Sequence, residues 1–241
     1  MRAETRHQLK TDAFSRTTIE AAGSAVHWTV EHKTRLVSGA IAVLVALLAG
    51  VGIWYYLSQQ DEKASLGLSQ AVRTMQEPVR PAGMPAQPDF PSFASSQERS
   101  IAARKQFREV VDKYPHTHTA DVARYFLGTT AIDLADNSAA EKDLKEVSEA
   151  GNRDLAALAK LALASLYANS NRTKDALELY KQLADRPTTT VPKVVAQLKL
   201  ASLYESSQQP AEAKHIYEQI LKENPGSESG ALAQSKIQEL K

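Results

Sequence analysis

An uncharged run of 22 residues, Leu36–Leu57, constrains the fold of this chain more than any other feature. The run contains no charged residue and no proline, and as a helix it would measure roughly 33 Å at about 1.5 Å per residue. The hydrocarbon core of a bilayer is about 30 Å thick. Residues 36–57 are therefore predicted to form one transmembrane helix, preceded by an N-terminal segment, residues 1–35, with a short amphipathic helix over Thr17–Lys33.

A cleaved signal peptide is the alternative for this run. Such peptides have an apolar stretch of about 7–15 residues and a small-residue cleavage site. Here 35 residues precede the run, and bulky aromatics end it at Trp54, Tyr55 and Tyr56. Aromatic rings suit the membrane–water interface, so we favour an uncleaved anchor.

The charges beside the run predict its orientation. Lys33 and Arg35 precede it, whereas Asp61 and Glu62 follow it with a lone Lys63. Positive residues are enriched on the cytoplasmic side of membrane helices. The N-terminus is therefore expected in the cytoplasm and the long C-terminal portion outside.

Small residues recur within the run at Ala42, Ala46 and Gly50. This spacing lets two membrane helices approach closely, although Ala and Gly are also common in such helices without any contact. A homo-oligomer held by these three residues stays open as an interpretation.

Composition limits the chemistry of the chain. Residues 1–35 hold six Lys or Arg and four Asp or Glu, and residues 58–241 hold 23 and 24. Neither side carries the basic field of a nucleic-acid-binding protein. The absence of cysteine from the sequence excludes disulfides, thiol catalysis and cysteine metal sites.

A helical pattern over Asp61–Gln76 predicts a juxtamembrane helix within residues 58–76, and residues 77–96 then carry many prolines. That density of proline predicts an extended loop, either a mobile insertion or a partner-binding segment. The prolines are Pro78, Pro81, Pro85, Pro88 and Pro91.

Residues 97–228 repeat themselves. A small residue recurs at Ala103, Ala140, Ala176 and Ala213, at intervals of 37, 36 and 37, and in the last three units another small residue stands 12 positions earlier. Only Gly or Ala lets the backbones of two crossing helices approach closely. The spacing therefore predicts helical hairpins. A longer loop such as 187–192 between units costs little.

The last unit carries the fullest motif. Gln197, Leu200-Ala201 and Tyr204 are followed by Ala213, Tyr217 and Pro225. This resembles the tetratricopeptide pattern W-x-x-L-G-x-x-Y…A-x-x-x-F…P, with Gln in place of Trp. The residues expected to pack the repeats are Gly128, Ala140, Ala164, Tyr167, Ala176, Tyr180, Ala201, Tyr204, Ala213 and Tyr217.

The expected fold class is all-α. A single N-terminal transmembrane helix precedes a right-handed α-solenoid of about three to four divergent tetratricopeptide-like hairpins. Residues 229–241 are expected to form a capping helix. Gly67 is a candidate for the first-helix slot of a leading hairpin, with the proline-rich loop as an insertion before Ala103.

No catalytic constellation emerges from the sequence, and no cofactor is predicted. His116, His118 and Asp121 could ligate a metal if they converged, but polar residues are ordinary in a turn between helices. Glu141, Asp143 and Glu146 sit among lysines and are interpreted as exposed charges on helix faces. We therefore expect a non-enzymatic protein.

The remaining functional feature is a groove lined by the first helix of each unit. Its expected slots are apolar or neutral and lack the basic residues of a clamp for peptide carboxylates. The groove is therefore expected to bind extended apolar segments or a folded partner. The groove residues are Tyr125, Thr129, Leu161, Ser165, Leu198 and Ser202.

The order of a segment with Trp28, a span ending in Trp54-Tyr55-Tyr56 and divergent repeats resembles the YfgM-type ancillary subunits of the bacterial Sec translocon. The resemblance implies a single-pass protein of the bacterial inner membrane with a periplasmic domain. Its implied partners are translocon subunits, periplasmic chaperones and emerging polypeptides. A structural cell-envelope protein with a cell-wall, division or outer-membrane-assembly partner is the alternative.

Overall fold

The computed structural model describes residues 33–81, 83–85 and 92–240, and the chain divides into two compact units, Met1–Tyr56 and Leu57–Lys241. The expected amphipathic helix over Thr17–Lys33 lies outside the described residues, apart from its last residue.

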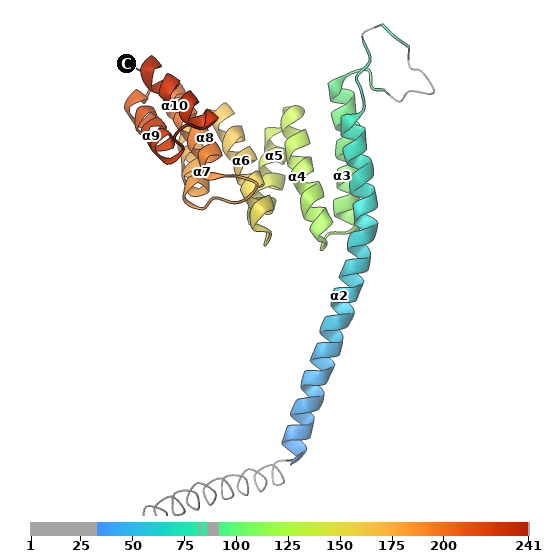
Figure 1. Ribbon diagram of the computed structural model, residues 1–241. Coiled ribbons are helices and arrows are strands. Elements are labelled where there is room, and N and C mark those ends of the chain that lie inside the picture. Colours follow the sequence, from blue (N-terminus) through green and yellow to red (C-terminus); the bar gives the residue numbers. More distant parts are fainter. Residues whose placement is uncertain (1–32, 82, 86–91, 241) are drawn as a thin grey trace, which may run out of the picture. The chain divides into compact units, whose positions relative to one another are not determined.

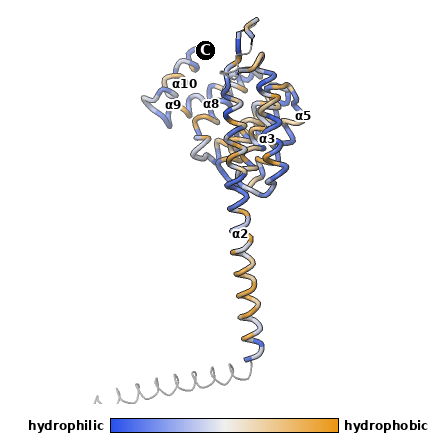
Figure 2. Tube along the Cα trace, turned by 90° about the vertical axis from the view of Figure 1, so that its right-hand side faces the viewer, coloured by the Kyte–Doolittle hydropathy of each residue, from blue (hydrophilic) through white to orange (hydrophobic). Residues whose placement is uncertain are grey.

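The first unit contains the apolar part of α2 (Lys33–Gln76), which has a mean hydropathy of 2.6 over its most apolar window and none of that window buried. By length and composition this segment suits a membrane span or a signal sequence. Figure 2 shows the almost continuous apolar colouring of this part of the helix. Ala42, Ala46 and Gly50 are all exposed on it.

Helix α2 has no end between the two segments 36–57 and 58–76, which we expected to be separate helices. Residues 57–63 contain neither proline nor glycine, so no residue there breaks the hydrogen-bond ladder. The juxtamembrane segment is therefore a continuation of the same 44-residue helix.

The second unit is an α-solenoid, which confirms the expected fold class. Each helix from α3 onward packs against the next in the chain (Figure 1). With the second half of α2, the described helices form four hairpins, α2/α3, α4/α5, α6/α7 and α8/α9, and α10 covers the last one. The bounds are α3 (Ser96–Lys113), α4 (His118–Asp133), α5 (Asn137–Ser148), α6 (Arg153–Asn169), α7 (Thr173–Asp185), α8 (Lys193–Ser206), α9 (Pro210–Glu223) and α10 (Glu228–Glu239).

The turn inside each of the last three hairpins uses one residue with a left-handed backbone. These residues are Ala135, Asn171 and Gln208, with φ of 59°, 59° and 57°. They follow one another at the repeat spacing, so each hairpin closes with the same short turn. At the other ends of the hairpins, side chains such as those of Thr117, Asn152 and Ser227 accept hydrogen bonds from the first turns of α4, α6 and α10.

Two clusters of buried side chains form the core. The first joins Ala64 and Ala71 of α2 to Phe107 of α3 and Leu127 of α4. A Cβ atom at Gly67 would meet the Val110 side chain at 2.9 Å, so α2 and α3 cross closely there. The second cluster runs without interruption from α4 to α10.

The proline-rich segment 77–96 has a closed base. Val79 and Phe93 form an isolated bridge, in which the Arg80 N–H donates to the Phe93 carbonyl at 2.9 Å. The Arg80 guanidinium also donates to the Ser92 carbonyl at 2.8 Å. The two ends of the expected loop are thus fixed to each other at the end of the α2/α3 hairpin.

Helix α10 lies where the capping helix was expected, over residues 229–241. Its Ala233 and Ile237 are buried against the preceding hairpin, whereas Leu232 is 47% exposed. The cap therefore leaves one apolar side chain open to solvent.

Candidate functional site

The first helices of three hairpins carry one matching row of apolar side chains. Tyr125 of α4, Leu161 of α6 and Leu198 of α8 stand at intervals of 36 and 37 residues. All three are half-buried and pack against the same core cluster. We call this row the apolar ladder; it occupies three of the six slots expected to line the groove.

Hydroxyl groups occupy the other three slots, and two of them bond within the protein. The Thr129 hydroxyl donates to the Phe126 carbonyl at 3.2 Å. The Ser165 hydroxyl lies 3.0 Å from the Leu161 carbonyl and 3.0 Å from the Tyr180 hydroxyl. Ser202 is exposed. Because two of the three hydroxyls already have partners, this surface is chiefly apolar and neutral.

Tyr125 contributes an aromatic surface and no charge. Its ring meets the edge of Phe126, with the ring centroids 5.5 Å apart. Burial raises the pKa of the Tyr125 hydroxyl, so it stays neutral in ordinary conditions. Burial raises the pKa of Tyr180 in the same way. Neither phenol is suited to act as an acid or base near neutral pH.

Two further apolar residues extend the ladder, and the sequence interpretation missed them. Val122 and Leu158 stand three positions before Tyr125 and Leu161, which places each pair on one helix face. Both are half-buried and pack against the same cluster. The repeat spacing that found Tyr125 and Leu161 also relates Val122 to Leu158.

The ten residues expected to pack the repeats are all buried. Helices α4 and α5 approach closely, because a Cβ atom at Gly128 would meet Leu144 Cγ at 2.6 Å. The helices that carry the apolar ladder therefore pack closely against the second helices of their hairpins.

Charged residues join neighbouring hairpins, and this corrects our interpretation of Glu141 as an ordinary exposed charge. Its carboxylate accepts hydrogen bonds from the Tyr167 hydroxyl at 2.9 Å and from Arg172 at 2.8 Å, and it pairs with Lys145 at 2.6 Å. Arg172 also stacks over the Tyr167 ring at 3.8 Å. Lys145, with Arg172 and Tyr167, lowers the pKa of Glu141 to about 2. Tyr167 and Arg172 belong to the next repeat, so spacing within α5 alone did not reveal them.

Asp143 is the second correction, because its side chain is only 4% exposed. Its nearest cation is Arg108 of α3, at 3.3 Å. Burial raises the pKa of this carboxyl, although Arg108 opposes the rise. Glu146 remains largely exposed and pairs with Arg124 at 3.3 Å.

The candidate metal ligands do not form a site. His116 and His118 are exposed, and Asp121 bonds to Arg124 at 3.4 Å. Across residues 33–81, 83–85 and 92–240, no group of three or more His, Asp or Glu is arranged to hold a metal ion.

Comparison with known proteins gives one family match. The model of the tetratricopeptide repeat-like domain matches residues 26–241. A search of curated proteins finds no match. Two solved structures are similar in fold. Both contain nearly identical TPR-like repeats of a putative kinesin light chain from Podosopora anserina. One is the parent and the other a variant of it. Each shows a TM-score of 0.54 and 16% identity over 75% of this chain, and they are covered over 86% and 85% of their own lengths.

Proposed function

Because the chain belongs to the tetratricopeptide repeat-like family, we propose that it is a non-enzymatic, membrane-anchored scaffold or chaperone-like adaptor at the bacterial Sec translocon. Repeat proteins of this kind generally serve as scaffolds for protein–protein interaction. In this proposal the apolar run anchors the chain in the inner membrane, with the N-terminus in the cytoplasm and the repeats in the periplasm. The repeats bind translocating polypeptides or periplasmic chaperones.

The apolar ladder is the observation that carries the proposal. Tyr125, Leu161 and Leu198 share one row, and two of the neighbouring hydroxyls are bonded internally. A surface with few free polar groups gains affinity from burying apolar area and discriminates weakly between side chains. That property suits a partner that meets many different unfolded segments.

Site-specific photo-cross-linking in cells tests this proposal. A photoreactive phenylalanine analogue at Leu161 or Leu198 is expected to cross-link to translocon subunits, periplasmic chaperones or newly exported chains. The same analogue at Glu218, an exposed residue on α9, is the control. If cross-links to all three partner classes are absent at 161 and 198 while the protein is well expressed, the proposal fails.

A protease-protection assay on membrane vesicles tests the orientation independently. With the repeats in the periplasm, protease added outside right-side-out vesicles should digest the second unit and leave the N-terminus protected. The reverse pattern would exclude every periplasmic partner named above.

A structural envelope protein that self-assembles is the second candidate. Ala42, Ala46 and Gly50 are exposed along α2, and apart from the neighbouring backbone of the helix itself nothing lies within 4 Å of a Cβ placed at Gly50. Replacement of Ala46 and Gly50 by Leu would block close helix contact. Cross-links that yield only homo-oligomers, lost in that variant, would favour this candidate over the adaptor.

A further inference from the structure

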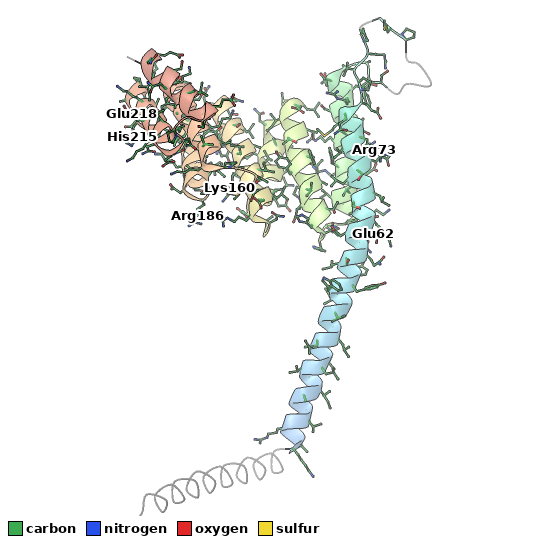
Figure 3. The ribbon with its side chains drawn as sticks, viewed as in Figure 1. Glu62, Arg73, Lys160, Arg186, His215 and Glu218 are labelled. Atoms are coloured by element: carbon green, nitrogen blue, oxygen red, sulfur yellow. The ribbon has the colours of Figure 1, made fainter. Side chains whose placement is uncertain are left out.

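A cavity of about 680 Å³ opens at one end of the α6/α7 hairpin. It lies where α6 begins and α7 ends, beside the turn that contains Gly151. Three cationic side chains, those of Arg153, Lys160 and Arg186, line it together with one acidic residue, Asp185. Figure 3 shows Lys160 and Arg186 in the lower half of this hairpin.

These cations have no acidic partner in the part of the chain that the structure describes. The ion pairs found there involve none of the three. Arg153 donates one hydrogen bond, to the Pro187 carbonyl at 3.2 Å. The cavity therefore concentrates positive charge that no ion pair among the described residues neutralises.

The two neighbouring hairpins hold different residues at the position equivalent to Lys160. The slot of Lys160 is held by Arg124 in the preceding hairpin and by Gln197 in the following one, at the repeat intervals of 36 and 37. Arg124 pairs with Glu146 at 3.3 Å, and Gln197 donates to Glu223 at 3.4 Å. Each neighbour thus closes this end of its hairpin with a carboxylate.

In the α6/α7 hairpin a cation occupies the slot of Glu223, and the neutral Gln182 occupies the slot of Glu146. Arg186 stands 37 residues before Glu223, in the matching slot at the end of the second helix. Lys160 and Arg186 therefore face a cavity where the following repeat has an amide and a carboxylate. Guanidinium and ammonium groups in such an arrangement bind oxyanions, and Arg does so through two parallel hydrogen bonds.

We propose that this cavity is a binding site for a phosphate oxyanion, held by Lys160, Arg186 and Arg153. The bound group would supply the negative charge that Glu223 supplies in the following hairpin. Free phosphate and the phosphate of a lipid headgroup share this chemistry.

Thermal unfolding of the full chain in an uncharged detergent tests the proposal. Circular dichroism at 222 nm is recorded in sodium phosphate and in sodium chloride of equal ionic strength, and with dihexanoyl phosphatidylglycerol below its micelle concentration. A bound ligand stabilises the folded state by mass action, so saturating phosphate should raise Tm by about 5 °C.

The variant Lys160→Gln with Arg186→Glu copies the pair Gln197 and Glu223 of the next hairpin. It is expected to fold with unchanged or higher Tm in chloride and to lose the rise in phosphate. Lys199→Gln with Lys222→Glu makes the same change in net charge outside the cavity and should keep the rise. A conservative Arg186→Lys variant should keep part of it.

Equal stabilisation by phosphate and by the short-chain lipid would identify free phosphate as the source, and a larger effect of the lipid would identify the headgroup. The proposal is overturned if neither raises Tm, if the rise persists in the Lys160→Gln/Arg186→Glu variant, or if only a polyglutamate peptide stabilises the protein. The cross-linking test at Leu161 and Leu198 probes the apolar ladder, so its outcome does not depend on whether phosphate binds in the cavity.

Discussion

In each of the last three hairpins, a small residue on the first helix is followed 16 positions later by a larger residue on the second helix. Two combinations of residues occur in this pair of positions. The first combination is Gly128 with Leu144, and the second is alanine with tyrosine, at Ala164 with Tyr180 and at Ala201 with Tyr217. Leucine branches at Cγ, and that atom would lie 2.6 Å from a Cβ at position 128. A branched partner thus requires glycine in a slot where the other hairpins hold alanine.

Gly128→Ala is therefore expected to destabilise the protein by about 1–2 kcal/mol, because the overpacking cost exceeds the gain in helix propensity. Denaturant unfolding of the full chain measures the change. Adding Leu144→Tyr should recover most of it, since this second change restores the pairing of the other two hairpins. The control Gly151→Ala, with open space at Cβ, should change stability little. An equal loss of unfolding free energy in the single and double variants would show that the residue at position 144 does not decide which residue is tolerated at position 128.

Two carboxylates on α5 respond to acid in opposite directions. Lys145, Arg172 and Tyr167 lower the pKa of Glu141 to about 2, whereas burial raises that of Asp143. A lowered folded-state pKa gives stability that is present above the ordinary value of 4.5 and is lost as the pH falls toward 2. A raised pKa has the opposite sign, because the folded state then binds the proton more tightly.

Glu141→Gln should therefore flatten the loss of unfolding free energy between pH 4.5 and pH 2. Asp143→Asn should steepen the acid loss, because it removes a group whose protonation favours the folded state. Unfolding curves provide the measurement, between pH 4.5 and pH 2 for Glu141→Gln and from neutral pH down to the ordinary value of 3.8 for Asp143→Asn. Parallel acid profiles for Glu141→Gln and the parent would contradict the role given to the contacts of Glu141.

At the scale of elements, the turns that close the last three hairpins share one backbone conformation but differ in the residue that adopts it. Ala135, Asn171 and Gln208 occupy one left-handed position in three successive repeats. Alanine is strained there because its Cβ approaches the following carbonyl, whereas asparagine tolerates the conformation better. The α4/α5 turn therefore stores strain that a single substitution can release.

Ala135→Gly is expected to stabilise the protein by about 1 kcal/mol, because glycine adopts positive φ without a steric cost. Asn171→Gly should have a smaller effect, since asparagine already suits the position. Denaturant unfolding of both variants tests this expectation. The midpoints can be compared if the dependence of the unfolding free energy on denaturant concentration is the same in both. A loss of stability in Ala135→Gly would mean that the methyl group makes contacts outweighing its backbone strain.

The connection between α7 and α8 is longer than the usual repeat requires, yet it is fixed to the unit. Val191 is fully buried, and the Thr190 hydroxyl donates to the Asp154 carbonyl at 2.9 Å. Val191→Ala should therefore cost about 1–2 kcal/mol of unfolding free energy through the cavity it leaves. Thr189→Ala, at an exposed neighbour, should cost almost nothing. Similar losses at the two positions would indicate a general effect of the loop and not a buried contact.

The helical hairpins can be predicted from the sequence because the small residues at their helix crossings recur at regular intervals. The intervals between Ala140, Ala176 and Ala213 repeat along the chain, so spacing alone identifies the hairpins. The burial of Asp143 and the contacts of Glu141 with Tyr167 and Arg172 depend on which residues of different repeats meet. The continuity of α2 escapes a prediction from hydropathy, because the pattern changes at Leu57 as it would at a helix end, although polarity alone does not end a helix.

At the scale of the molecule, α2 takes part in both units. Its first half carries the exposed apolar run, and its second half supplies Ala64 and Ala71 to the core around Phe107. A fragment of residues 97–241 would leave Phe107 and Val110 without their α2 contacts. It is therefore expected to unfold at a lower Tm than a fragment of residues 57–241, which matches the second compact unit. Equal Tm values would show that α2 adds nothing to the repeats.

The fragment 57–241 also allows binding to be measured apart from the proposed membrane anchoring. It retains the apolar ladder at Tyr125, Leu161 and Leu198, so it should fold as a helical domain and bind an apolar peptide in solution like the full chain. A weak binding surface gains effective concentration when it is tethered at a membrane, as proposed above for this chain. The fragment, exported to the periplasm, is therefore expected to lose most of the cellular function and most cross-links at position 161. Complementation by the exported fragment at the level of the full chain would show that the groove works without its anchor.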